Sequence, residues 1–130
     1  MFSRGLWISI VLLLALTACV QEAKSYAGPQ EIVRALEDAG ISCTALKVAD
    51  GTTLGDTEHA SLVAQRGVCV VENEEVTITT FRSEQDRDDW LAVGRLLHRT
   101  AYGPDWAVTG ASDEVVDDIA EALGASTDGK

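Results

Sequence analysis

The sequence predicts an α+β domain in which a small antiparallel sheet, of about three or four strands, has helices packed on one face. Segments with the helical spacing of apolar residues occur between short apolar segments that suit strands. Two of the strand segments, 68–72 and 75–81, are close enough in sequence to form a hairpin. The 130 residues suit a single domain with one core.

The first and last predicted helices have clear start and stop signals. A helix over 29–39 begins with Pro29, which suits a first helical turn, and ends before Gly40. The last helix begins after Ser112, a good N-cap, and ends at Gly124. Their apolar stripes are Ile32, Val33 and Leu36 in the first helix and Val115, Val116, Ile119 and Leu123 in the last.

A middle helix is predicted after Ser83, a good N-cap. Several acidic residues occupy its first turn, where their negative charge interacts favourably with the helix dipole. Its basic end is formed by Arg95, His98 and Arg99, and the chain leaves the helix at Tyr102-Gly103-Pro104. The expected buried stripe consists of Trp90, Val93, Leu96 and Leu97.

The strands are predicted from short apolar segments between turn residues. These segments are 41–48, the hairpin strands 68–72 and 75–81, and 105–109. An Asn73-Glu74 turn would place Val71 opposite Val76 and Cys69 opposite Ile78, all on the core face. Residues 49–66 are expected to form a loop with one helical turn near 60–64.

The N-terminal segment has the pattern of a signal peptide: Arg4 precedes an apolar stretch over 6–16. The stretch is shorter than a membrane-spanning helix requires. Its end, Leu16-Thr17-Ala18-Cys19, resembles the lipobox of bacterial lipoproteins. That resemblance implies cleavage before Cys19 and a thioether-linked diacylglyceryl group on its thiol, with acylation of the new amino group, for example by palmitate, varying among bacteria. The alternative is an ordinary signal-peptidase site in which Cys19 is an incidental small residue.

This assignment divides the chain into four parts: a signal peptide over 1–18, a lipidated N-terminus and tether over 19–28, a domain over 29–124, and a flexible tail over 125–130. The Gly103-Pro104-Asp105-Trp106 run and the closing Leu123-Gly124 resemble small exported lipoproteins of high-GC Gram-positive bacteria. That resemblance implies no activity.

Two cysteines remain in the domain, Cys43 and Cys69, and export to an oxidising compartment favours a disulfide between them. Closing that loop would stabilise the fold by about 3–4 kcal/mol on the chain-entropy model. The alternatives are two buried free thiols or a redox pair, although the sequence has no Cys-x-x-Cys motif.

The formal net charge of −11, from 21 acidic and 10 basic residues, argues against nucleic acid as a partner. We expect no cofactor, metal or catalytic residues, because His59 and His98 have no metal-ligand spacing and no Gly-x-Ser-x-Gly motif is present. Acidic clusters are expected to be solvated surfaces, with divalent-cation binding as the alternative. Trp90 and Trp106 are expected in the core, with ligand stacking as the alternative.

The first hypothesis for function is a non-enzymatic binding or interaction module of the cell envelope. It would be held on the extracytoplasmic face of the cell membrane by lipid on Cys19 and would bind an envelope protein or a cell-wall component. A small-ligand or divalent-cation binder, using the acidic surfaces or the 50–56 loop, is the second hypothesis. The third is a hydrolase without a recognisable motif.

Overall fold

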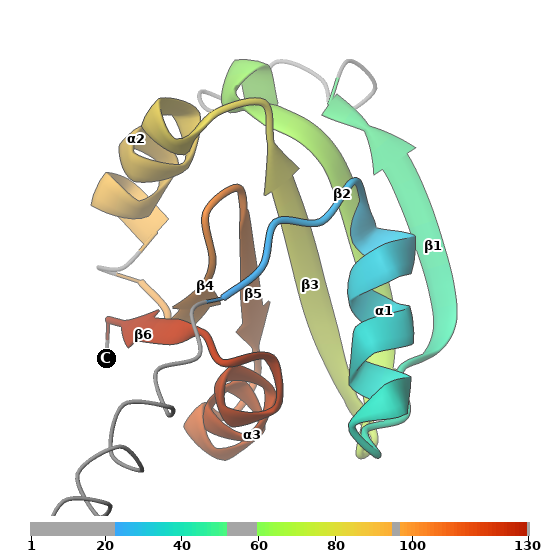
Figure 1. The fold of residues 1–130 in the computed structure, drawn as a ribbon. Helices are drawn as coiled ribbons and strands as arrows, with labels where there is room; N and C mark the ends of the chain where they lie inside the picture. Colours follow the sequence, from blue (N-terminus) through green and yellow to red (C-terminus); the bar gives the residue numbers. More distant parts are fainter. Residues whose placement is uncertain (1–22, 52–59, 95–96, 130) are drawn as a thin grey trace, which may run out of the picture.

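The structure, a computed structural model, describes residues 23–51, 60–94 and 97–129, which form a six-stranded antiparallel sheet and three helices (Figure 1). In chain order the elements are α1 (Pro29–Asp38), β1 (Thr44–Asp50), the 3-10 turn η3 (Ala60–Leu62), β2 (Val63–Val71), β3 (Glu74–Phe81), α2 (Glu84–Gly94), β4 (Thr100–Tyr102), β5 (Trp106–Gly110), α3 (Asp113–Leu123) and β6 (Ser126–Asp128). The strand order is β1-β2-β3-β5-β4-β6, so β1 and β6 form opposite edges. The predicted α+β class is confirmed, but the sheet is larger than the three or four strands expected.

Helices α1 and α3 form as predicted, because in each helix the start and stop signals enclose the same residues that carry the apolar stripe. The Ser112 side chain accepts a hydrogen bond from the Val115 amide at 3.3 Å, and Gly124 ends α3 in the left-handed conformation at φ 63°. Gly40 follows α1 with φ 89°. All seven residues expected in the two stripes are buried, and they form the main core with the sheet.

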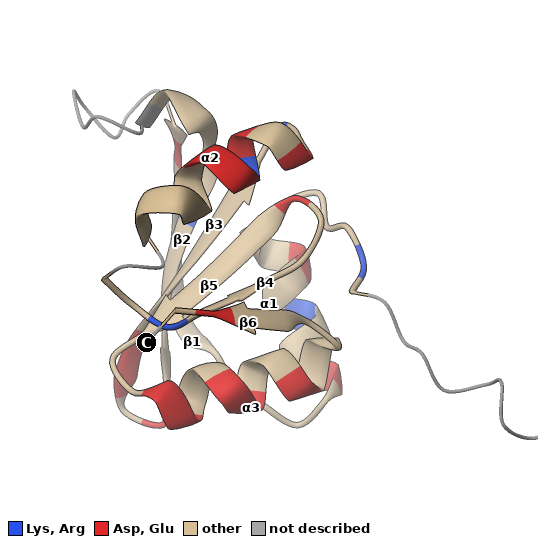
Figure 2. Cartoon of the chain, turned by 90° about the vertical axis from the view of Figure 1, so that its left-hand side faces the viewer, with Lys and Arg blue, Asp and Glu red and all other residues tan. Residues whose placement is uncertain are grey.

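The expectation that helices cover one face of the sheet is wrong. Helices α1 and α3 lie on one face, whereas α2 lies on the other (Figures 1 and 2). On the α2 side, the ring centroids of Trp90 and Phe81 are 5.5 Å apart. Side chains alternate along a strand, so Ile78 faces the main core while Phe81 faces α2. Both faces of this part of the sheet therefore carry apolar side chains, and helices shield each face from water.

Helix α2 begins as predicted but ends earlier. The Ser83 hydroxyl accepts a hydrogen bond from the Asp86 amide at 3.1 Å, as an N-cap does. The helix ends at Gly94, and the following segment becomes strand β4. Leu91 is its buried residue, whereas Val93 and Leu97 are 40% and 67% exposed. The predicted stripe is thus wrong for these two residues; Leu96 and Arg95 lie outside the described residues.

The hairpin is confirmed with a corrected register. Its turn is Glu72-Asn73, both with positive φ (51° and 67°), and Cys69 lies opposite Val76. The register differs from the expected one by two residues, which leaves the same side chains on the core face because the side-chain period of a strand is two. Strand β2 also begins at Val63, within the segment expected to be a loop.

Two other boundaries differ. Strand β1 lies over Thr44–Asp50 rather than 41–48, and Ala45 has φ 57° where its register with β2 shifts. The tail expected to be flexible contributes β6, which pairs with β4.

Candidate functional site

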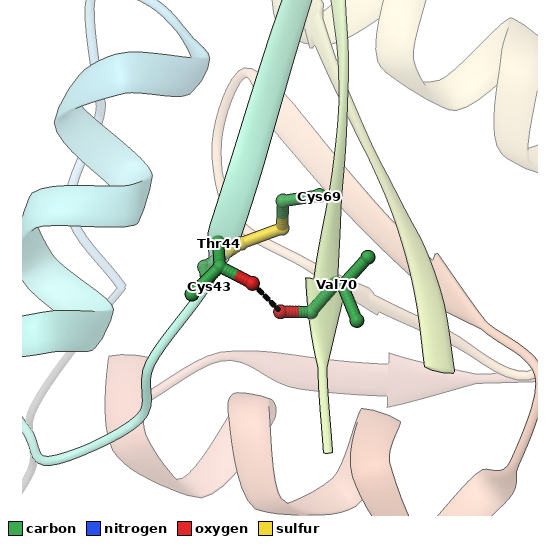
Figure 3. The surroundings of a disulfide bond; sticks show 4 residues. All are labelled: Cys43, Thr44, Cys69 and Val70. Carbon is green, nitrogen blue, oxygen red and sulfur yellow. Dashed lines mark hydrogen bonds between the residues drawn. A yellow bond between two sulfur atoms is a disulfide. The ribbon is translucent and has the colours of Figure 1, made fainter. Parts of the chain in front are cut away.

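Cys43 and Cys69 lie at disulfide-bonding distance, as predicted (Figure 3). Their Cα atoms are 5.5 Å apart, and both residues are buried in the main core. Beside them, the Thr44 hydroxyl donates a hydrogen bond to the Val70 carbonyl at 3.4 Å. The pair links the start of β1 to β2, so it acts as a structural cross-link of the sheet edge.

The other candidate residues are spread over the molecule. Cys19 and His59 lie outside the described residues, and His98 is exposed just before β4. Trp106 is fully buried and Trp90 is half-buried beside Phe81, so both are packing residues. The acidic residues of α3, coloured red on its ribbon in Figure 2, are exposed; they are Asp113, Glu114, Asp117, Asp118 and Glu121.

The segment 23–28, expected to be a flexible tether, is instead packed onto the domain. The Trp106 indole Nε1 donates a hydrogen bond to the Lys24 carbonyl at 2.7 Å, and the Tyr26 and Trp106 ring centroids are 5.8 Å apart. Ala23 and Tyr26 also pack against the main core. We call residues 23–28 the N-terminal strap.

Asp105 and Glu31 of α1 also hold the strap by hydrogen bonds. One Asp105 carboxylate oxygen accepts a hydrogen bond from the Ser25 hydroxyl, and the other accepts one from the Tyr26 amide at 3.4 Å. Glu31 of α1 accepts a hydrogen bond from the Ala27 amide at 2.8 Å. Burial, and to a lesser extent the negative charge of Glu31, raise the pKa of Tyr26 above its ordinary value. These contacts give the Gly103-Pro104-Asp105-Trp106 run a structural role.

Gly103 permits the turn that presents Trp106 to the strap. A Cβ atom at position 103 would lie 2.3 Å from the Trp106 Nε1 atom, which is closer than any real contact. The Gly103 amide also donates a hydrogen bond to the Trp106 carbonyl at 3.0 Å. A larger residue would therefore displace the indole that holds Lys24.

A cleft of about 310 Å³ lies where the strap meets the sheet edge. Its lining residues are Ala23, Glu84, Arg87, Tyr102, Gly103, Pro104, Gly124 and Ser126. A second hollow, of about 330 Å³, is lined by Arg87, Asp88, Leu91, Ala92, Tyr102 and Asp128. Arg87 and Tyr102 belong to both, so the two hollows adjoin at this pair. Their size is at the lower end of the range typical of ligand sites, roughly 300–1,000 Å³.

Arg87 joins α2 to the turn below the cleft. Its guanidinium donates hydrogen bonds to the Gly103 and Pro104 carbonyls at 2.7 and 3.2 Å, and it also contacts Asp88 at 2.7 Å. Its carbon Cζ lies 5.3 Å from the centroid of the Tyr102 ring. Because these partners already occupy most of its donors, Arg87 shapes the cleft rather than offering a free cation to a ligand.

The part of the chain that the structure describes contains no group of three or more His, Cys, Asp or Glu side chains that could hold a metal ion. Within that same part, no helix is both long and apolar enough to cross a membrane. No protein-family model matches the chain, and no curated protein or solved structure matches it.

Sequence reasoning did not identify the Arg87–Tyr102 pair or the strap. The only signal for Arg87 was a basic residue within the acidic start of α2. Trp106 and Lys24 lie 82 residues apart, so no local pattern could indicate their contact.

Proposed function

We propose that the protein is a lipoprotein of the bacterial cell envelope, anchored through lipid on Cys19 at the extracytoplasmic face of the membrane. Its domain acts there as a non-enzymatic interaction module. The observation that carries the anchor is Leu16-Thr17-Ala18-Cys19 at the end of the apolar N-terminal stretch. Two acyl chains give stable membrane attachment, whereas one chain binds only marginally.

The surface around Arg87 and Tyr102 supports the interaction role. Tyrosine is enriched where proteins bind one another, and Tyr102 lies between two adjoining hollows that Arg87 helps to shape. Glu84 and Asp88 also line these hollows, and their carboxylates suit hydrogen-bond donors on a partner. We assign the partner to the envelope proteins or cell-wall components.

Mass spectrometry of the membrane-extracted protein tests the anchor. The wild type should carry a diacylglyceryl group on Cys19 and remain with the membrane fraction, whereas Cys19→Ser should be unlipidated. The variant retains Cys43 and Cys69, so loss of the disulfide cannot explain its behaviour. A soluble, unlipidated wild-type protein would refute the proposal.

Crosslinking in intact cells tests the interaction surface. A partner crosslinked to the wild type should be lost with Tyr102→Ser, while a control at the opposite sheet edge, Lys47→Ser, should keep it. Thermal unfolding of both variants checks that each is folded. Equal crosslinking by the two folded variants would exclude this surface.

A further inference from the structure

We propose that the β6 edge of the sheet faces the bilayer and that the β1 edge points away from it. This orientation rests on the lipid anchor at Cys19 proposed above. It follows from where the strap is held on the domain, and from the small number of residues between the strap and Cys19.

The residues that the structure describes begin at Ala23. Trp106, Asp105 and Glu31 hold the strap on the domain. While these contacts are intact, the strap adds no length to the connection between Cys19 and the domain. Ala23 lines the cleft together with Ser126 of β6. The attachment point is therefore at the β6 edge.

The remaining connection is short compared with the sheet. Four residue spacings join Cys19 to Ala23, and a fully extended chain covers at most about 14 Å over that separation. Strands β1 and β6 lie at opposite edges of the six-stranded sheet, and five interstrand spacings amount to about 24 Å. The connection therefore excludes orientations in which the β1 edge faces the bilayer and the β6 edge points outward. A free tether over 19–28 would have allowed them, because it could extend to roughly 30 Å or more.

The domain as a whole is acidic, so anionic lipid would repel it. The short connection, and not charge, supports this orientation, so it should occur on zwitterionic phosphatidylcholine.

The test uses the full lipidated chain reconstituted into phosphatidylcholine vesicles that contain lipids with a quencher on the head group. A fluorescent amino acid replaces Ser126 on β6 or Lys47 on β1, both exposed positions. We expect quenching at position 126 to be at least about twofold stronger than at position 47, given the separation of the edges.

Two changes to the connection should remove this difference. A flexible Gly-Ser linker of about twelve residues inserted between residues 22 and 23 allows the domain to rotate freely, and quenching at the two positions should become equal. Asp105→Ala combined with Trp106→Phe releases the strap and should reduce the ratio in the same direction. Asp38→Ala, an exposed carboxylate on α1, is the matched control and should leave the ratio unchanged. Thermal unfolding verifies that each variant is folded.

The possible failures are separable. Equal quenching at positions 126 and 47 in protein whose lipid is confirmed by mass spectrometry would overturn the orientation and leave the anchor intact. Absence of lipid on Cys19 would overturn the anchor, and the orientation with it.

Discussion

Trp106 joins two parts of the chain that lie 82 residues apart, through its hydrogen bond to the Lys24 carbonyl. Its ring is fully buried, and Tyr26 packs against it. Buried indoles need a partner for their N–H group, and here that partner is the backbone of the N-terminal strap. One side chain therefore contributes to the core and also holds the N-terminal strap on the domain.

Gly103 is the residue on which the position of this indole depends. Gly103→Ala should lower the free energy of unfolding by about 1–3 kcal/mol, because the new methyl group overlaps the indole. Gly110→Ala is the matched control, since its Cβ would be 3.4 Å from the nearest atom, an ordinary contact. Urea unfolding compares the two. Equal stability of both variants would contradict the close contact between Gly103 and Trp106.

Tyr26 should make the strap sensitive to alkaline pH. Its pKa is raised in the folded state, so the neutral phenol is favoured on folding. Any stability from this shift is fully present below the unfolded-state pKa of about 10 and is lost as the pH rises through the higher folded-state value. The wild type should therefore lose more thermal stability than Tyr26→Phe between neutral pH and pH about 11. Parallel pH profiles for the two proteins would show that Tyr26 does not contribute.

At the scale of an element, α2 shows how a correct start signal can precede a wrong stripe. Ser83 caps the helix, but the helix ends at Gly94 and leaves Val93 and Leu97 exposed. The apolar residues beyond Gly94 suggested a longer helix because their spacing continued the pattern. The chain instead turns into β4, whose pairing with β5 and β6 satisfies the backbone of the sheet.

The same substitution at two leucines should distinguish the observed packing from the predicted stripe. Leu91→Ala should cost about 2–4 kcal/mol of stability because it empties a buried site. Leu97→Ala should change stability by less than about 0.5 kcal/mol, since this side chain is 67% exposed. Denaturant midpoints measure both. Similar losses for the two variants would place Leu97 in the core.

For the whole molecule, two short segments, 23–28 and 126–128, complete the domain. The strap covers Trp106, and β6 forms the last strand of the sheet beside β4. Arg99 connects the same region to α3 and β6, since its guanidinium donates hydrogen bonds to Asp117 at 2.6 Å and to the Thr127 hydroxyl at 3.3 Å. The hydrogen bond to Asp117 is the main cause that raises the pKa of Arg99.

Removal of residues 125–130 tests whether the C-terminal segment belongs to the fold. The truncated protein should lose about 1–2 kcal/mol of stability, because β4 loses its β6 partner and becomes an edge. Replacement of the exposed Ser126 and Thr127 side chains by Ala, which retains the strand backbone, is the control and should cost less. Thermal unfolding measures both proteins. An unchanged melting temperature after truncation would show that the tail contributes nothing.

The sequence by itself determined those features whose signals are local: the caps and stripes of α1 and α3, the hairpin, and the core face that carries Cys69 and Val76. It also contains the lipobox-like run ending in Cys19, on which the proposed anchor depends. Only the tertiary structure decided that β6 and the strap are parts of the domain, and that α2 covers the second face. Short segments such as 23–28 and 126–128 have too few residues for a periodic pattern, and their stability comes from partners distant in sequence. Their partners are Trp106 of β5 and Tyr102 of β4, which only the tertiary fold brings beside them.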